Sequence, residues 1–299
     1  MPTLTPVVNL ETLASAPSIT EQNAAAATHT IIRTFLEGVS SLNKYSVDTH
    51  LHGSYKNSTN VSRNSDVDIG AQSDQIYLYD VSGLPQDQLA RFKETTSPGT
   101  FTFEDYRRDI LASLRSQYGP QVIDGNKAIT IPGNTYRLPA DVLPCVEFRH
   151  YWNYQSGPGS FATGIAFLTK QGNRIVNFPQ QHFDNLTTKN TATGEYFKGC
   201  IRIMKRIRND LVRDGAIDER HSSSCYLESL LWNAPDALFK GGYPTAIREV
   251  LLHLYKELDA GSATSYVQAN NVYLLFHSEF WSVAQAKELV SLVWNRIFS

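Results

Sequence analysis

Two aspartates, Asp66 and Asp68, stand two residues apart at the end of a polar run that opens with Gly53 and Ser54. In a β-strand, side chains two residues apart share a face, so both carboxylates would point one way while Val67 points into the core. Paired carboxylate oxygens suit a hard divalent cation such as Mg²⁺. Such an ion can be presented to the phosphates of a nucleoside triphosphate, which makes metal-assisted phosphoryl chemistry the first hypothesis.

A third acid, Asp141, is embedded in an apolar stretch, residues 136–143, that we expect to form a strand. An acid is costly to bury without a partner, so this one faces a ligand or pairs with a base. Three acids can hold two metal ions: one ion accompanies the triphosphate, and the other lies against the attacking hydroxyl and favours loss of its proton. We therefore predict that Asp66, Asp68 and Asp141 are the catalytic and metal-binding residues, with two Mg²⁺ ions, or Mn²⁺ in their place, as cofactors.

The glycine and serine that precede the acids predict a phosphate-binding turn. Gly53 lets the backbone approach a ligand closely, and Ser54 would hold the terminal phosphates through its amide and hydroxyl. Lys56, in the same run, either contacts phosphate or only solvates the loop, and the sequence leaves both open. Turns and acid pairs are each common alone, but their combination with Asp141 predicts nucleotidyl transfer, in which a ribose hydroxyl attacks an α-phosphorus and pyrophosphate leaves.

The composition is that of a water-soluble globular protein. Of the 299 residues, 41% are hydrophobic and 19% are charged, and we find no apolar stretch of about eighteen residues that would span a membrane. The formal net charge of −2 gives no bulk attraction to polyanions, which argues against a nucleic-acid template. The three cysteines lack the paired spacing of a zinc site, and no secretory signal is evident, so we expect a cytoplasmic protein.

Hydrophobic periodicity divides the chain into a front half with strands and a back half of helices. We expect a loose segment at residues 1–17, a long helix from residue 18 and an insertion or linker, rather than a packed element, at 80–103. A β-hairpin is expected over residues 161–178. The domains are then a nucleotidyltransferase core at 18–180 and a helical domain at 181–299. Four helices are expected in the latter, at residues 195–214, 222–232, 245–259 and 282–298.

The turn at Gly53 and Ser54, the pair Asp66 and Asp68, and Asp141 resemble the signature of polymerase-β-type nucleotidyltransferases. More narrowly, the run that links them is similar to the cGAS/DncV-like nucleotidyltransferases (CD-NTases) of bacterial CBASS antiphage systems, with clade E the nearest group. The resemblance implies an α+β fold: a polymerase-β-like nucleotidyltransferase lobe with a mixed β-sheet, a C-terminal helical lobe, and an active site in the cleft between them.

The resemblance continues into the helical half. Residues 200–205 look like the helix in which this family places a lysine, here Lys205, against the donor phosphates. Residues 223–226 look like the serine-rich turn of the family, so Ser224 is expected to bind nucleotide and Tyr226 to stack on a base. Other interpretations stay open, because a basic helix face is usually solvated and Tyr226 precedes leucines at helical spacing, as a core aromatic would.

The family resemblance also implies the product. Such enzymes condense nucleoside triphosphates, here ATP and a pyrimidine such as UTP, into a cyclic di- or trinucleotide that diffuses to an effector protein. One alternative is a related transferase that acts on a linear oligonucleotide, an RNA or an antibiotic; the net charge argues against RNA. The other is a catalytically inactive nucleotide-binding scaffold, which the presence of all three acids disfavours.

Overall fold

The computed structural model divides the chain into two compact units. One, the sheet unit, contains residues 19–55 and 64–179, and the other, the helical unit, contains residues 1–18, 56–63 and 180–299. Within these units the structure describes residues 5–61, 66–97, 99–155, 159–218, 222–277 and 281–298.

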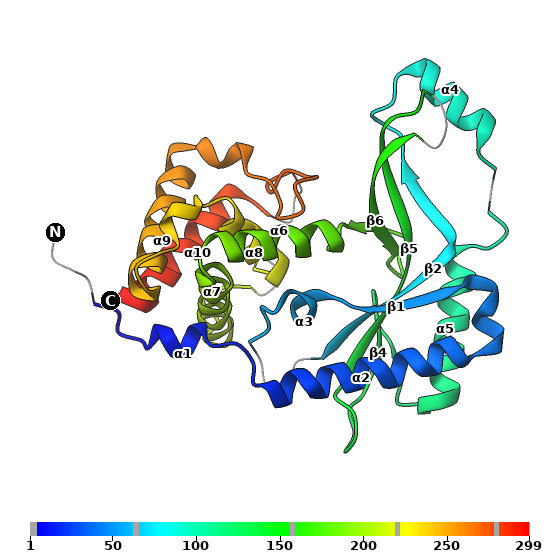
Figure 1. Ribbon diagram of the computed structural model, residues 1–299, viewed down its shortest axis with the longest axis horizontal. Coiled ribbons are helices and arrows are strands. Elements are labelled where there is room, and N and C mark those ends of the chain that lie inside the picture. Colours follow the sequence, from blue (N-terminus) through cyan, green and yellow to red (C-terminus); the bar gives the residue numbers. More distant parts are fainter. Residues whose placement is uncertain are drawn as a thin grey trace. The chain divides into compact units, whose positions relative to one another are not determined.

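The sheet unit is built on a mixed seven-stranded sheet (Figure 1). Its two long central strands, β2 and β5, pair in parallel, and every other pairing is antiparallel. The β2 strand is continuous across an irregularity in its register between Ser73 and Tyr77. The strands are β1 (Val47–Leu51), β2 (Val67–Asp80), β3 (Ile123–Asp124), β4 (Ile129–Ile131), β5 (Ala140–Asn153), β6 (Ser160–Leu168) and β7 (Arg174–Asn177).

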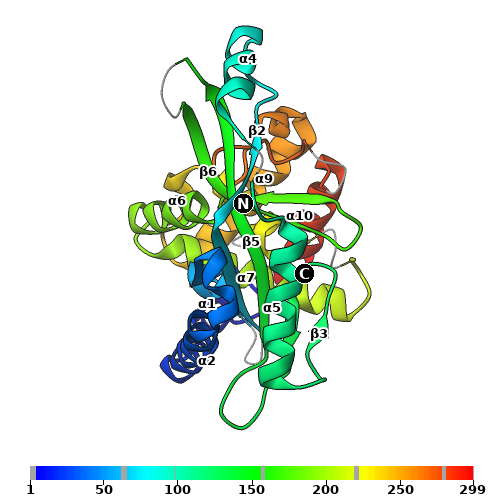
Figure 2. The same ribbon diagram turned by 90° about the vertical axis from the view of Figure 1, so that its right-hand side faces the viewer.

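Helices of the sheet unit cover the sheet with their apolar stripes. The long helix α2 buries Ala25, Ile32 and Leu36 and contacts β1 and β2, and α5 contacts β5. Figure 2 shows α5 lying alongside β5. The expected hairpin is present as β6 and β7. The helical elements are α2 (Ile19–Gly38), η1 (Ser40–Tyr45), α3 (Gly53–Asn57), whose last two residues belong to the helical unit, α4 (Gln86–Thr95) and α5 (Phe103–Tyr118).

The segment 80–103 corrects one expectation. Its glycines and prolines predicted a linker, but residues 86–95 form α4, and Phe92 at the end of this helix is 1% exposed. The Phe92 ring meets the edges of Tyr151 and Tyr154, with centroids 5.3 and 5.0 Å apart. Aromatic pairs of this geometry add to the burial of the rings. These aromatic contacts therefore hold α4 in place, although the glycines and prolines around it had predicted a linker.

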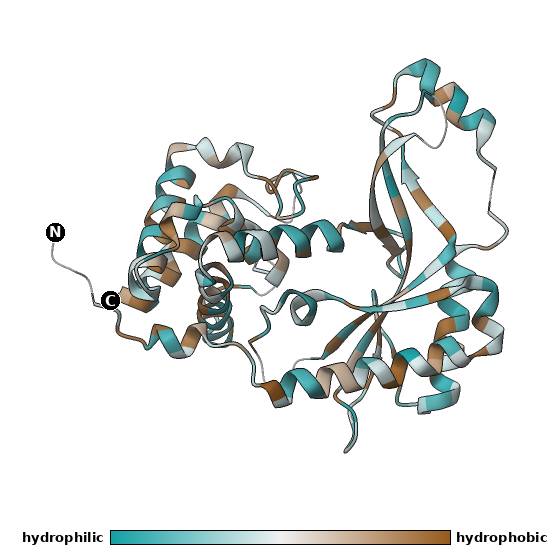
Figure 3. Cartoon of the chain, in the orientation of Figure 1, coloured by the Kyte–Doolittle hydropathy of each residue, from teal (hydrophilic) through white to brown (hydrophobic). Residues whose placement is uncertain are grey.

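The helical unit packs around α7, which is buried over most of its length. The four helices expected from periodicity are all present as α7, α8, α9 and α10, and the helices α1 and α6 precede them along the chain. Figure 3 shows hydrophilic and hydrophobic residues mixed along these helices, and within the described residues no helix is both long and apolar enough to cross a bilayer. The elements are α1 (Leu10–Ala14), α6 (Pro179–Ala192), α7 (Tyr196–Arg213), α8 (Ser224–Trp232), η3 (Asp236–Leu238), α9 (Tyr243–Ala260), η4 (Ser262–Ser265) and α10 (Val283–Phe298).

The amino-terminal segment is a second correction. Residues 10–14 form α1, where a loose end was expected. The side chain of Asn9 caps this helix by accepting from the amide of Thr12, and Leu10 and Ala14 are buried in the core of the helical unit. Arg202 Nε of α7 donates to the carbonyl of Ala14 at 2.6 Å. The short helix α1 is thus held by three features: its cap, two buried residues one turn apart, and a hydrogen bond from Arg202 at its carboxyl end.

Candidate active site

The three predicted acids meet at the start of the two central strands. Asp68 on β2 and Asp141 on β5 are direct neighbours in the parallel register, and Asp66 immediately precedes β2. The amide of Val67 donates to the carbonyl of Pro139 at 2.9 Å, which extends the ladder to the first residue of β2. Val67 is 0% exposed, so alternation along the strand sends its side chain to the core and leaves Asp68 on the other face. Strand pairing therefore brings together acids from distant parts of the sequence.

Electrostatics show that these carboxylates interact. Burial raises the pKa of Asp66, and the negative charge of Asp141 raises it further. The Oδ1 atom of Asp141 accepts a hydrogen bond from Thr130 Oγ1 at 2.6 Å, from the position directly opposite on β4. Nothing in the sequence indicates this role of Thr130, because only the pairing of β4 with β5 places it opposite Asp141. Carboxylates that repel one another are a suitable environment for a cation.

The three acids lie at the same end of the sheet, but their carboxylate groups do not all point toward one position. Asp141 is turned to Thr130, and the Oδ2 atom of Asp68 lies beside the backbone of Gly53. Accordingly, the described part of the chain contains no group of three or more His, Cys, Asp or Glu side chains already placed to hold a metal ion. The donors are nevertheless of the right kind for Mg²⁺, since this ion prefers carboxylate oxygens and brings its own water ligands.

The glycine of the predicted phosphate-binding turn contacts the acid strand. Gly53 has a φ of +58°, and a Cβ atom at this position would lie 2.4 Å from Asp68 Oδ2. The preceding residue, His52, donates its amide to the carbonyl of Asp68 at 2.8 Å. Ser54 follows as the second residue of α3 and is half-buried. Only glycine satisfies both the backbone conformation and the close approach, and the phosphate-binding role of Ser54 stays a prediction.

We expect Gly53→Ala to lower the rate of cyclic product formation by at least about tenfold, because the methyl group would displace the Asp68 carboxylate. The left-handed backbone adds a stability cost of about 1 to 2 kcal/mol. Gly172→Ala is the matched control, since Gly172 has a φ of +80° with nothing within 4 Å of the added Cβ. Both variants should lose similar stability in urea unfolding. Equal activity of the two variants would show that the close contact with Asp68 has no catalytic consequence.

In the helical unit, Lys205 is locked in a buried cluster around Glu228. Lys205 Nζ lies 2.6 Å from Glu228 Oε1 and 2.9 Å from Thr59 Oγ1. The same carboxylate accepts from Thr59 at 2.5 Å, from Asn57 at 3.2 Å and pairs with His182 Nε2 at 2.6 Å. We call these five residues the Glu228 cluster. Lys205 and Glu228 are 1% and 2% exposed, so two of the three ammonium donors are already used inside the protein.

The charged groups of the Glu228 cluster stabilise one another in their ionised forms. Burial alone would raise the pKa of Glu228, but the charges of Lys205 and His182 outweigh burial and hold it low. Burial likewise opposes the charged form of His182, yet hydrogen bonds with Cys225 and Glu228 raise its pKa to about 10. One carboxylate therefore faces two cations. The expectation that Lys205 lies against donor phosphates stays a prediction, and its buried ion pair argues against it in this conformation.

The turn that precedes α8 holds the remaining predicted residues. Ser224, the first residue of α8, is half-buried, and Ser223 caps the helix by accepting from the amide of Tyr226. The ring of Tyr226 is 0% exposed and stacks on Trp281, with centroids 5.1 Å apart. Burial raises the pKa of Tyr226. The ring is therefore part of the core of the helical unit as it lies here, and its stacking on a nucleobase stays a prediction.

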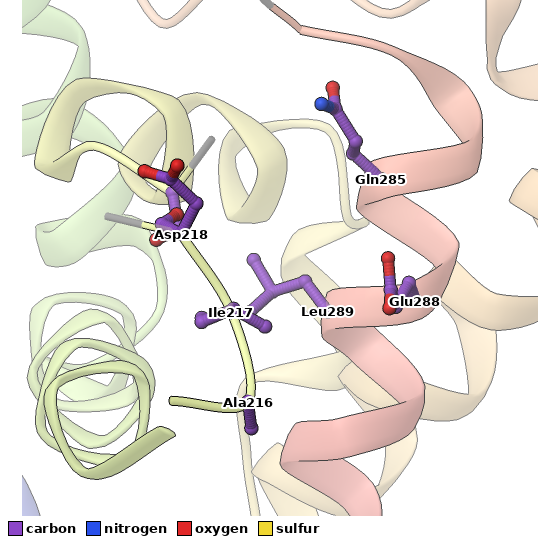
Figure 4. A pocket seen from close by; sticks show the side chains of 7 residues that line it. Ala216, Ile217, Asp218, Gln285, Glu288 and Leu289 are labelled. Atoms are coloured by element: carbon purple, nitrogen blue, oxygen red, sulfur yellow. Dashed lines mark hydrogen bonds between the residues drawn. The ribbon is translucent and has the colours of Figure 1, made fainter. Parts of the chain in front are cut away.

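A hollow of about 170 Å³ in the helical unit is not suited to phosphate. It lies between residues 216–218 and α10 (Figure 4). Its described lining includes the acids Asp218 and Glu288 and no lysine or arginine. A triphosphate would be repelled there.

Comparisons with known proteins identify the family of this chain. Residues 184–297 match the family model of the cGAS/DncV-like nucleotidyltransferase C-terminal helical domain. The chain is 30% identical over 285 residues to the cyclic dipyrimidine nucleotide synthase CdnE of Legionella pneumophila, which covers 94% of each chain. It is 32% identical over 251 residues to a cyclic dipurine nucleotide synthase of Elizabethkingia meningoseptica, which covers 83% of this chain and 84% of that one.

Solved structures give the same result. The Rhodothermus marinus CdnE c-UMP-AMP synthase, solved with Apcpp and Upnpp, superimposes with a TM-score of 0.80 at 30% identity and covers 95% of this chain and 93% of its own. The fold and the named relatives define the class of protein as a nucleotidyltransferase. Within that class, the chain belongs to the cGAS/DncV-like nucleotidyltransferases of the CBASS type, in clade E. The expected α+β fold and the family resemblance are confirmed, and the chain is a synthase of a cyclic oligonucleotide second messenger.

Proposed function

We propose that the protein joins ATP and a pyrimidine nucleotide such as UTP into a cyclic dinucleotide through two magnesium-assisted transfers. The observation that carries the proposal is the in-register pair Asp68 and Asp141, with Asp66 beside it. Relatives differ in their bases, since their names specify dipyrimidine, dipurine and UMP-AMP products. The Rhodothermus marinus cyclic UMP-AMP synthase, 33% identical over 68% of this chain, supports a mixed purine and pyrimidine product.

Each transfer forms one phosphodiester bond and releases one pyrophosphate. A ribose hydroxyl of one nucleotide loses its proton and attacks the α-phosphorus of the other, and the bond from that phosphorus to the bridging oxygen of pyrophosphate breaks. The second transfer closes the ring in the same way. Asp66, Asp68 and Asp141 would hold the magnesium ions, which when bound neutralise the triphosphate and favour the ionised hydroxyl. Ser54 would orient the terminal phosphates.

Catalysis on this scheme comes mainly from positioning. The ladder between β2 and β5 fixes the spacing of the acids, and the contact with Gly53 fixes the phosphate-binding turn against Asp68. Preorganised charges of this kind supply transition-state stabilisation without reorganisation during the reaction. The product would then diffuse to an effector protein in an antiphage response.

Incubation of the full chain with labelled ATP, GTP, CTP and UTP and Mg²⁺, followed by phosphatase treatment and chromatography, tests the proposal. Phosphatase-resistant product labelled by both ATP and UTP is the expected result, and a chelator should abolish it. A product from two purines or two pyrimidines would overturn the base assignment. Labelled linear product or RNA would support another acceptor, and no turnover with any pair of nucleotides would support an inactive scaffold.

A further inference from the structure

Thr130 on β4 holds one oxygen of the third acid, Asp141. Its hydroxyl donates to Asp141 Oδ1 at 2.6 Å, a length typical of a hydrogen bond from a hydroxyl to an ionised carboxylate. Among the described residues, the side chain of Asp141 forms no second hydrogen bond and no ion pair. The protein therefore fixes this carboxylate through Oδ1 and leaves Oδ2 for another partner.

The pairing of β4 with β5 determines where the hydroxyl points. Ile129 and Ile131 are each 0% exposed, so alternation along β4 turns Thr130 to the opposite face of the strand. The antiparallel register then places Thr130 directly opposite Asp141. Threonine is β-branched, and its first side-chain torsion angle is restricted. The register and the stiff side chain together aim the hydroxyl at one oxygen of the carboxylate.

The carboxylate held in this way is one of the three predicted metal ligands. Asp68 is the direct neighbour of Asp141 in the ladder of β2 and β5, and the charge of Asp141 reaches Asp66, whose pKa it raises. Mg²⁺ requires nearly ideal octahedral geometry, so the direction of each carboxylate oxygen matters. The terminal torsion angle of an aspartate is broad when nothing restrains it. Carboxylates that bind metal ions are accordingly held by hydrogen bonds from neighbouring groups.

We infer that Thr130 is a positioning residue for nucleotidyl transfer: its hydroxyl fixes the orientation of the Asp141 carboxylate and leaves Oδ2 to bind Mg²⁺. This inference rests on the proposed function, in which Asp141 holds a magnesium ion. Thr130 acts through Asp141. Without the hydroxyl, the carboxylate would sample several orientations, and the metal ion would be held less tightly.

The test is Thr130→Val, which replaces the hydroxyl by a methyl group of similar size. Titration of the full chain with Mn²⁺ alone, followed by electron paramagnetic resonance of the free ion, should give a dissociation constant about tenfold above that of the wild type. Product formation at limiting Mg²⁺ should fall about 10- to 100-fold, and excess Mg²⁺ should recover part of the loss. Thr130→Ser keeps a hydroxyl and should retain most of the affinity and of the rate. Thr130→Ala carries the same expectation as the valine variant and replaces it if valine prevents folding.

Thr49→Val is the matched control, because it makes the same replacement at a threonine whose hydroxyl holds nothing. Thr49 lies on β1 and is 5% exposed, and its hydroxyl has no hydrogen-bond partner within the described part of the chain. This variant should bind Mn²⁺ and form product as the wild type does. It should also unfold at the same or a higher urea concentration, since it removes an unpaired buried hydroxyl.

Unchanged Mn²⁺ affinity in Thr130→Val, with or without a lower unfolding midpoint, would overturn the positioning role, and so would an equal loss in Thr49→Val. If the wild type makes cyclic product and Thr130→Val matches it in both measurements, the positioning role alone fails. If Thr130→Val weakens Mn²⁺ binding but the wild type makes no cyclic product, Thr130 positions a metal-binding acid and the proposed function fails.

Discussion

Replacement of Asp66 and Asp68 together by Asn should lower cyclic product formation by at least about 1,000-fold, which is about 4 kcal/mol of activation free energy. The variant keeps the shape of both side chains but removes the negative charges that would hold magnesium beside the triphosphate. Because burial and Asp141 already raise the pKa of Asp66, removing charge also relieves repulsion at the edge of the sheet. We therefore expect the folded state to be as stable as that of the wild type. Product chromatography and thermal unfolding measure the two effects.

The matched control for this experiment is Asp74→Asn. Asp74 is an exposed acid on the same strand, β2, six residues beyond Asp68. Its replacement should leave product formation within about twofold of the wild type, since surface substitutions away from a site have small effects. Retained synthesis in the Asp66 and Asp68 double variant would show that the acids do not hold the catalytic metals, whatever the family likeness.

Replacement of Glu228 by Gln should destabilise the protein by about 3 kcal/mol. Glu228 faces Lys205 and His182 at 2.6 Å each inside the helical unit, and the neutral amide leaves these cations without their shared counter-charge. Loss of one partner from a buried ion pair is costly because the other charge remains in a medium that solvates it poorly. Urea unfolding followed by far-ultraviolet circular dichroism measures the loss.

Two further variants make the stability test specific. Glu249→Gln removes a half-buried carboxylate of α9 that pairs with its neighbour Arg248 near the surface, and it should change stability by no more than about 0.5 kcal/mol. Addition of Lys205→Met to Glu228→Gln removes one stranded cation and should recover part of the loss. If Glu228→Gln unfolds at the same urea concentration as the wild type, the cluster contributes no net stability and its role must be sought elsewhere.

The sequence predicted elements whose signals are local. Helices α7, α9 and α10 follow from apolar residues at helical spacing, and the placement of Val67 and Asp68 on opposite faces of β2 follows from alternation. The placement of Asp141 beside Asp66 and Asp68 could be predicted, because an acid in an apolar strand is costly to bury unless it has a partner or a ligand. The Asp141 neighbour Thr130 escaped notice, because its position depends on which strand lies beside β5.

The two wrong expectations, for residues 80–103 and for residues 1–17, have a common physical origin in long-range packing. The helix α4 is stabilised by Tyr151 and Tyr154 from β5 and the residue just beyond it, and α1 by contacts with α7, so neither signal lies in its own segment. Long-range packing also supplies contacts that the sequence of a single helix does not reveal. Lys205 of α7 pairs with Glu228 of α8, and Tyr226 of α8 stacks on Trp281. The nucleotide-binding roles of Lys205 and Tyr226 stay predictions.

The parallel pairing of β2 with β5 has a consequence for the newly made chain. Asp68 and Asp141 become neighbours only after a long intervening stretch, including α4, α5, β3 and β4, has been synthesised and its ends have closed into one ladder. Such distant closures are slow steps in folding. Nascent or truncated chains that end before β5 lack Asp141. We therefore expect synthesis of the cyclic product to begin only after β5 has been made and has paired with β2.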